Sequence, residues 1–219
     1  MKCRFCQNFL FSQLGNGEEI STAKLASRML RLQRQRVHNI NLVTPTHFLP
    51  QILAALWLVI PKGFRLPIIW NSSGYEKGEV LQLLDGIVSV YLPDMKYADD
   101  DIAEQLSSAP GYKKINRESV SEMFRQVGHL RLGEDGLAIK GLIIRHLVLP
   151  EDHAQTWKTL RWIRENLGAE THISLMRQYF PVHKALKTKG IDRKISDEEY
   201  EDTVQWLEKY GLDNGWIQG

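Results

Sequence analysis

The two cysteines of the chain, Cys3 and Cys6, lie three positions apart with Phe5 between them. Thiolates bind zinc and iron–sulfur clusters, and a close pair of thiols can also act as a redox couple. Two cysteines in 219 residues form no disulfide framework. Taken alone, the pair is compatible with half of a zinc site completed by a second chain, with a redox pair, or with two idle thiols.

Other polar residues with chemical potential follow short apolar runs. The runs are rich in branched residues and short enough to be strands, and most lack alternation, which suits strands covered on both faces. They occupy residues 39–43, 66–70, 87–92, 142–149 and 172–176. The polar segments at or after their ends are 44–47, 71–75, 94–96, 145–146 and 177–179.

Helical patterns fill the gaps between these runs. They cover residues 21–37, 48–60, 80–84, 102–106, 118–127, 153–167 and 196–210. Ser21 is a fair N-cap, Pro50 suits a first turn, and Ser196 with Glu199 forms a capping box. Strands alternating with helices predict parallel βα units with right-handed crossovers, in a single α/β domain spanning residues 1–219.

In parallel sheets and barrels, ligands bind at the carboxyl ends of the strands, where these polar segments fall. Thr44 and Thr46 have hydroxyls and carbonyls that can accept from an ammonium, or they form a strand-to-helix turn. Asn71 and Ser73 suit hydrogen bonds to a ribose or a carboxylate, or belong to a turn cluster. Gly74 permits a tight turn or the close approach of a ligand.

Three ionisable residues are the strongest candidates for ligand binding. Asp94 and Lys96 alternate along the end of the third run, so both side chains can face one cavity. Arg145 lies within an apolar run, where a buried guanidinium needs an anionic partner. The alternative for Asp94 and Lys96 is an exposed ion pair of little energetic value.

Composition limits the possible partners and the compartment. The formal net charge of +2 is too small to indicate a nucleic-acid partner. No apolar run reaches the roughly 18 residues of a membrane span, and the chain begins without the apolar region of a signal peptide. We therefore expect a cytoplasmic protein with no membrane association, in which a close cysteine pair is more often metal-binding or redox-active than structural.

Several stretches together resemble the radical S-adenosylmethionine (SAM) family, and in particular proteins similar to pyruvate formate-lyase activating enzymes. These stretches are CRFCQN, HNINLVTPTHFLPQI, PIIWNSSGY, VSVYLPDMKY, GLIIRHLVLP, ISLMRQYFP and NGWIQ, and they span nearly the whole chain. The resemblance implies a partial (β/α)6 barrel with a [4Fe–4S] cluster and SAM as cofactors.

The family's cluster loop has the pattern Cys-x3-Cys-x-aromatic-Cys. Cys3 and Cys6 match its last two cysteines, and Phe5 matches the aromatic position next to the cofactor. The first cysteine of the pattern would lie two residues before Met1, and the first strand of the barrel would lie further upstream. We therefore expect an N-terminally truncated barrel that lacks its first strand and the third cysteine ligand of the cluster.

The resemblance also implies a function. In that family the cluster and SAM generate a 5′-deoxyadenosyl radical, and the implied SAM-binding residues here are Thr44, Thr46, Asn71, Ser73, Asp94, Lys96 and Arg145. The implied partners are a protein substrate of the glycyl-radical type and a flavodoxin- or ferredoxin-like electron donor. Two alternatives are a truncated barrel impaired in catalysis and a dimer bridged by zinc through Cys3 and Cys6.

Overall fold

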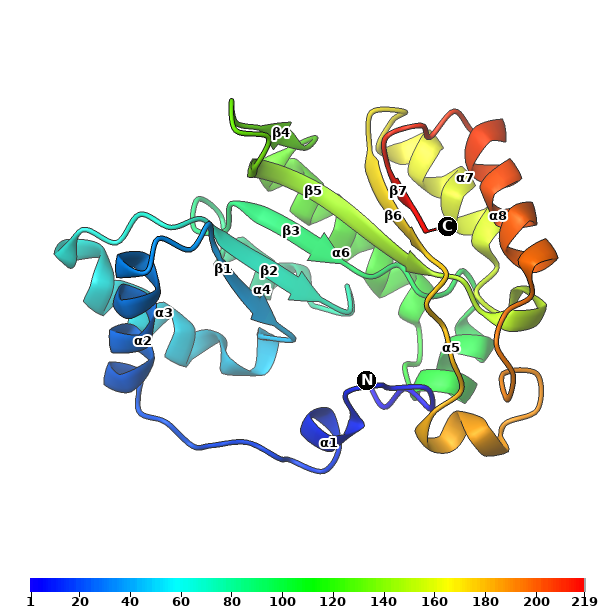
Figure 1. Ribbon diagram of the computed structural model, residues 1–219, viewed down its shortest axis with the longest axis horizontal. Coiled ribbons are helices and arrows are strands. Elements are labelled where there is room, and N and C mark those ends of the chain that lie inside the picture. The colour runs from blue at the N-terminus through cyan, green and yellow to red at the C-terminus, as the bar shows by residue number, and fades with distance from the viewer. Residues whose placement is uncertain (219) are drawn as a thin grey trace.

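The computed structural model describes residues 1–218 as an α/β fold built on one seven-stranded sheet (Figure 1). The strands are β1 (Ile40–Val43), β2 (Ile68–Ser72), β3 (Val90–Pro93), β4 (Arg131–Leu132), β5 (Ala138–Leu147), β6 (His172–Met176) and β7 (Gly215–Ile217). Their order is β1-β2-β3-β5-β6-β7, with every neighbouring pair parallel, while β4 pairs antiparallel with β5. The predicted α/β class with parallel βα units is confirmed.

Helices connect the strands. The α-helices are α1 (Phe9–Ser12), α2 (Thr22–Arg34), α3 (Leu49–Val59), α4 (Gly78–Gln82), α5 (Asp100–Ser107), α6 (Tyr112–Val127), α7 (Thr156–Asn166) and α8 (Asp197–Lys209). Short 3-10 turns lie at η1 (Thr46–Phe48), η2 (Ile60–Lys62), η3 (Pro150–Asp152) and η4 (His183–Lys187). Among residues 1–218, no helix combines the length and the apolar content that crossing a bilayer requires.

Local sequence signals explain several helix ends. The Ser21 side chain accepts a hydrogen bond from the backbone of Lys24, and Ser196 and Glu199 form the predicted capping box of α8. Pro50 lies in the first turn of α3, as expected. These three predictions from the sequence are confirmed.

The prediction of five strands was incomplete. It missed β4 and β7, which are two and three residues long and exposed, because neither forms an apolar run. The third strand was placed too early, since β3 covers Val90–Pro93 and Ile87 lies in a turn. The predicted helix at 118–127 is the second half of α6, whose first turns are too polar to show a clear apolar face.

The sheet is open among the described residues, with β1 at one edge and β7 at the other. One apolar cluster packs α2, α3, α4 and α6 against the sheet, with Trp70 and Tyr91 as its largest buried side chains. A second cluster lies toward the carboxyl ends of β5 and β6 and includes Phe5. The arrowheads of β1, β2, β3 and β5 lie on the side of the sheet that faces the N-terminal loop (Figure 1). The fold therefore brings the cysteine loop to the carboxyl ends of the strands, where ligand sites form in parallel sheets.

Candidate functional site

Asp94, Lys96 and Arg145 come together at the carboxyl ends of β3 and β5. Asp94 directly follows β3 and forms an isolated parallel bridge with Arg145 of β5. Asp94 Oδ2 lies 2.5 Å from Lys96 Nζ, and Asp94 Oδ1 lies 2.7 Å from Arg145 Nη2. The predicted convergence of these three side chains is therefore observed, but the carboxylate partner of Arg145 is Asp94 itself.

This cluster is largely shielded from water and carries an excess positive charge. The side chains of Asp94, Lys96 and Arg145 are 11%, 15% and 26% exposed. Burial alone would lower the pKa of Lys96, but the charges of Asp94 and of Cys3 outweigh burial and raise that pKa above its ordinary value. Lys96 thus stays an ammonium, and one carboxylate faces two cations.

Two polar atoms of the cluster lack a well-aligned hydrogen bond. Among the described residues, Arg145 Nε and Asp94 Oδ1 are buried without such a partner, although Oδ1 is within ion-pair distance of the guanidinium. A buried donor without a partner is costly, so it favours an anionic ligand at this position. The cluster fits a ligand that carries both a carboxylate and an ammonium, because it offers both kinds of partner.

The cysteine loop is fixed between two parts of the fold. The backbone N–H groups of Lys2 and Arg4 donate to the carbonyls of Ser107 and Leu106 at the end of α5, each at 2.8 Å. On the other side, the N–H of Ala185 donates to the carbonyl of Arg4 at 2.9 Å. These contacts hold the loop in place without using the cysteine side chains.

Cys3 and Cys6 are both free thiols of intermediate exposure. Burial raises the pKa of Tyr97 and of Tyr112, and the charge of Cys3 raises both further, so Cys3 is electrostatically coupled to the residues around Lys96. Cys6 Sγ lies 3.2 Å from the hydroxyl of Ser12. The predicted metal ligands therefore lie on the side of the sheet that holds the charged cluster.

The fit of this loop to a [4Fe–4S] cluster is partial. The thiolates of Cys3 and Cys6 are the correct ligand type for iron. Within residues 1–218, no group of three His, Cys, Asp or Glu side chains could hold a metal ion. A cluster bound by three thiolates would therefore need a ligand from outside these residues.

Phe5 and the predicted residues after β1 and β2 have different environments. Phe5 is buried and packs edge to face on Tyr179, with ring centroids 5.7 Å apart. Thr44 is exposed with a φ of 51°, whereas the Thr46 hydroxyl donates to Glu76 Oε1 at 2.5 Å. In this state Phe5 and Thr46 bind other parts of the chain, and Thr44 stays open to solvent.

Asn71 lies near the carboxyl end of β2, and Ser73 directly follows this strand. Asn71 is buried, and its backbone carbonyl accepts a hydrogen bond from the N–H of Thr44 at 2.8 Å. Ser73 is half-buried, and its carbonyl accepts from the Tyr112 hydroxyl at 3.1 Å. Both residues are therefore held through their backbone carbonyls.

Glu76 is a central residue of the site that the sequence reasoning missed. It is 5% exposed and accepts hydrogen bonds from Trp70 Nε1 at 2.9 Å, from Ser72 Oγ at 2.5 Å and from Thr46. This carboxylate ties the ends of β1 and β2 together through side chains. The sequence could have indicated Glu76, because it directly follows the polar segment 71–75 at the end of the apolar run 66–70.

Gly74 and Asn116 connect the β2 loop to the β3 loop. Asn116 Nδ2 donates to the carbonyls of Gly74 and Asp94, at 3.0 and 2.9 Å. Gly74 has a φ of +63°, and a Cβ there would lie 2.3 Å from Asn116 Nδ2 and 2.6 Å from the Asp94 carbonyl oxygen. We predicted that Gly74 permits a tight turn or the close approach of a ligand. In the structure it permits the close approach of Asn116 and of the Asp94 carbonyl.

His146 is a structural residue on the opposite side of β5 from Arg145. It is fully buried, its Nδ1 lies 2.6 Å from the carbonyl of Met95, and its Nε2 lies 2.9 Å from the hydroxyl of Thr156. A carbonyl only accepts, which assigns the proton of the neutral ring to Nδ1. Burial is the main reason that the pKa of His146 is lowered from 6.5 to about 4.

The lowered pKa of His146 predicts an acid-sensitive fold. Between pH 6.5 and 4 the unfolded chain binds a proton that the folded chain does not, so the free energy of unfolding falls as the pH falls through this window. We expect this histidine to contribute a loss of about 2–3 kcal/mol between pH 7 and pH 4.5, measured by urea denaturation. His146→Asn, whose amide can replace the Nδ1 donor and does not titrate, serves as the control. An equally steep pH dependence in the variant would contradict this assignment.

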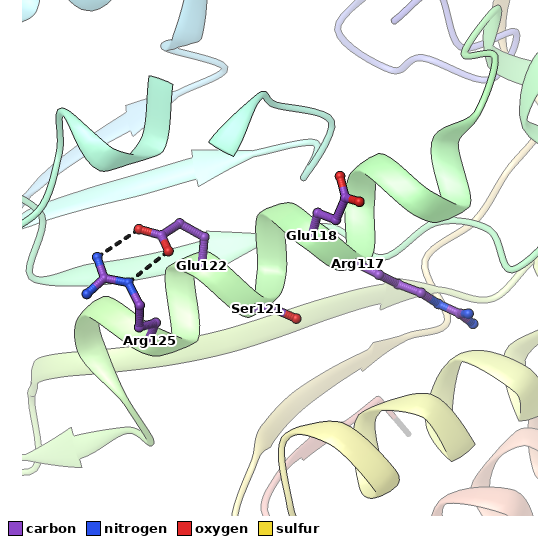
Figure 2. A pocket seen from close by; sticks show the side chains of 5 residues that line it. All are labelled: Arg117, Glu118, Ser121, Glu122 and Arg125. Carbon is purple, nitrogen blue, oxygen red and sulfur yellow. Dashed lines mark hydrogen bonds and ion pairs between the residues drawn. The ribbon is translucent and has the colours of Figure 1, made fainter. Parts of the chain in front are cut away.

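A charged surface on α6 is a weaker candidate for a ligand site. Arg117, Glu118, Ser121, Glu122 and Arg125 line a shallow hollow on this helix (Figure 2). Figure 2 shows the Arg125 guanidinium joined to the Glu122 carboxylate, and Arg125 Nη2 also lies 2.8 Å from Asp85. Arg125 and Glu122 pair with each other, Glu118 pairs with Lys114, and Arg117 lies over the ring of Trp162, so most of the charge on this face already has a partner.

Comparison with known proteins agrees with the fold. No family model matches the sequence. The uncharacterized protein MJ0674 of Methanocaldococcus jannaschii is 32% identical over 222 aligned residues, which cover 97% of this chain. The chain spans 60% of the length of that relative.

Two solved structures of HydG resemble the fold. One, described as a maturase of the [FeFe]-hydrogenase, matches with a TM-score of 0.60 and 10% identity, over 98% of this chain and 48% of its own. The other, the FeFe-hydrogenase maturase from Carboxydothermus hydrogenoformans, matches with a TM-score of 0.63 and 14% identity, over 99% of this chain and 49% of its own. At these identities the likeness concerns the fold alone, and it supports the α/β architecture expected from the sequence.

Proposed function

We propose that this chain forms the cofactor-binding part of a radical SAM iron–sulfur enzyme. The observation that carries the proposal is the buried cluster of Asp94, Lys96 and Arg145 beside the cysteine loop. The parallel strand order and the likeness of the fold to HydG support it. The finer expectation of a partial (β/α)6 barrel related to glycyl-radical activating enzymes belongs to the same proposal.

In this proposal the side chains at the carboxyl ends of the strands bind SAM through ion pairs and hydrogen bonds. The Arg145 guanidinium, with its unpaired Nε, and the Lys96 ammonium are partners for the carboxylate of SAM. Asp94 and the exposed oxygens of Thr44 are partners for its ammonium, and the side-chain amide of Asn71 and the hydroxyl of Ser73 suit its ribose. Thr46 contributes through Glu76, which fixes the ends of β1 and β2.

Cys3 and Cys6 are the proposed iron ligands. The proposal requires a third thiolate in addition to these two. When bound, a reduced [4Fe–4S] cluster would donate one electron to SAM, and cleavage of the carbon–sulfur bond would then give methionine and a 5′-deoxyadenosyl radical. Phe5, packed on Tyr179, holds the loop against the second apolar cluster.

We further propose the reaction partners that the family resemblance implies. The substrate is a protein of the glycyl-radical type, and the electron donor is a flavodoxin- or ferredoxin-like protein, with all three in the cytoplasm. The activity of the whole protein is part of this proposal, because the chain spans 60% of its curated relative.

Anaerobic iron–sulfur reconstitution tests the proposal. The chain is compared with a variant whose N-terminal extension places a cysteine four positions before Cys3, which completes the three-cysteine pattern. We expect the extended variant to bind about four iron atoms per chain and to release 5′-deoxyadenosine from SAM on reduction. Cys6→Ala in the extended variant is the control and should lose both signals.

The outcome that overturns the proposal is equally specific. An extended variant that binds no iron and cleaves no SAM would exclude radical SAM chemistry at this loop. Zinc bound by a dimer through Cys3 and Cys6 would instead favour a four-thiolate zinc site.

A further inference from the structure

A second cavity opens at the carboxyl end of β6. It has a volume of about 450 Å³ and is lined by Arg177, Gln178, Tyr179, Phe180, Lys194 and Ile195. Ligand pockets for small molecules typically measure about 300–1,000 Å³, so the cavity is large enough for one small organic group. None of its lining residues belongs to the cluster around Asp94.

The lining combines two cations with apolar surface. Arg177 pairs with the exposed Asp197, and its guanidinium lies 5.5 Å from the centre of the Tyr200 ring, which holds it in place. Lys194 is exposed, and no acidic side chain pairs with it in the described part of the chain. The ring of Phe180 is 42% exposed at the same cavity. A carboxylate carried on an apolar or aromatic group matches this lining.

The chain around the cavity strengthens its attraction for anions. The segment 183–194 contains Lys184, Lys187, Lys189, Arg193 and Lys194 but only one acidic residue, Asp192. Clustered charges of one sign raise the local concentration of the opposite charge and speed its association. Arg193 of this segment pairs with Glu199, so the lysines supply its net positive charge, and the segment contacts the cysteine loop through the Ala185 N–H and the Arg4 carbonyl.

Two contacts place the cavity next to the cysteine loop. Gln7 Nε2 donates to the carbonyl of Gln178 at 3.4 Å, and Phe5 packs on Tyr179. The Tyr179 hydroxyl in turn donates to the carbonyl of Ile191 at 2.5 Å, which ties the cavity wall to the basic segment. Two residues that line the cavity, Gln178 and Tyr179, therefore contact the cysteine loop.

We propose that this cavity binds an organic carboxylate with an aromatic or apolar portion. The carboxylate pairs with Lys194, beside the ion pair of Arg177 with Asp197, and the apolar portion packs on Phe180 and Ile195. The further identification of this ligand as the substrate rests on the proposed function, whereas the affinity for carboxylates does not.

Binding of 3-phenylpropionate and of 3-phenylpropionamide to the chain, without iron or SAM, tests the proposal. We expect the acid to bind at least ten times more tightly than the amide. NMR chemical-shift changes at Phe180 and its neighbours measure the binding of each compound. Lys194→Gln should weaken acid binding about five- to ten-fold and leave amide binding unchanged, and Lys194→Arg should restore it. Lys189→Gln is the matched control, because it removes the same charge from the same segment outside the cavity.

Equal affinity for the acid and the amide would overturn the proposal, as would equal losses in Lys194→Gln and Lys189→Gln. The carboxylate could belong to a small acid or to the C-terminus of a polypeptide. A short peptide that ends in phenylalanine, with either a free or an amidated C-terminus, distinguishes the two. Preference for the free peptide acid identifies a polypeptide terminus, and preference confined to 3-phenylpropionate identifies a small acid. Failure of iron–sulfur reconstitution leaves all these binding results unaffected, so the two proposals fail separately.

Discussion

Asp94→Asn is expected to lower the free energy of unfolding by about 3–5 kcal/mol, the usual cost of removing one partner of a buried ion pair. Asp94 is the carboxylate that faces both Lys96 and Arg145, and none of the three side chains is more than 26% exposed. The substitution preserves the shape of the side chain but leaves two cations close together in a shielded site. Urea denaturation monitored by tryptophan fluorescence measures the loss.

The matched control is Glu118→Gln, which also removes one negative charge. Glu118 pairs with Lys114 at 3.9 Å, and both side chains are more than half exposed. Exposed pairs contribute about 0–1 kcal/mol, so the control should change stability little. A double variant, Asp94→Asn with Arg145→Met, should regain part of the loss because one of the two cations is gone. A loss below about 1 kcal/mol in Asp94→Asn would show that water screens the cluster.

Glu76→Ala is expected to lower the free energy of unfolding by a similar amount, about 3–5 kcal/mol, because unsatisfied buried polar groups cost about 1–3 kcal/mol each. The substitution removes the acceptor of Thr46, Trp70 and Ser72 and leaves a cavity. The two hydroxyls can rotate toward other acceptors, but the indole N–H of the fully buried Trp70 cannot. Thermal and urea denaturation measure the effect.

Glu76→Gln separates the hydrogen bonds of this residue from its charge. The amide oxygen can still accept from Trp70, and the volume is preserved, so a loss of about 1–2 kcal/mol is expected from one mismatched hydrogen bond. Equal losses in the glutamine and alanine variants would mean that the negative charge, rather than the hydrogen bonds, stabilises the loop. In either variant the strand ends that carry Thr46 and Asn71 should loosen, which amide hydrogen exchange detects.

The local sequence was enough to predict most helices and strands, and to predict that the site lies at the carboxyl ends of the strands. Strands such as His172–Met176 were predicted from short runs of branched residues, and α8 from its capping box. Parallel strands place their carboxyl ends together, so Asp94, Lys96 and Arg145 were expected to meet once their strands were identified. Apolar periodicity did not reveal β7, because its three residues are exposed and gain their order only by pairing with β6.

Only the tertiary structure decided how the polar groups pair. From the sequence we predicted that Arg145 and Thr46 bind a ligand. In the structure Arg145 pairs with Asp94, and Thr46 donates a hydrogen bond to Glu76. The family resemblance implied that Cys3 and Lys96 belong to one cofactor site, but apolar periodicity could not show it, because the two residues are 93 positions apart and approach through the packing of the loop on α5. Periodicity reports which face of an element is buried, whereas the partner of a buried charge depends on contacts between distant segments. The residues that can do chemistry are therefore evident from the sequence, while their arrangement into a site is a property of the fold.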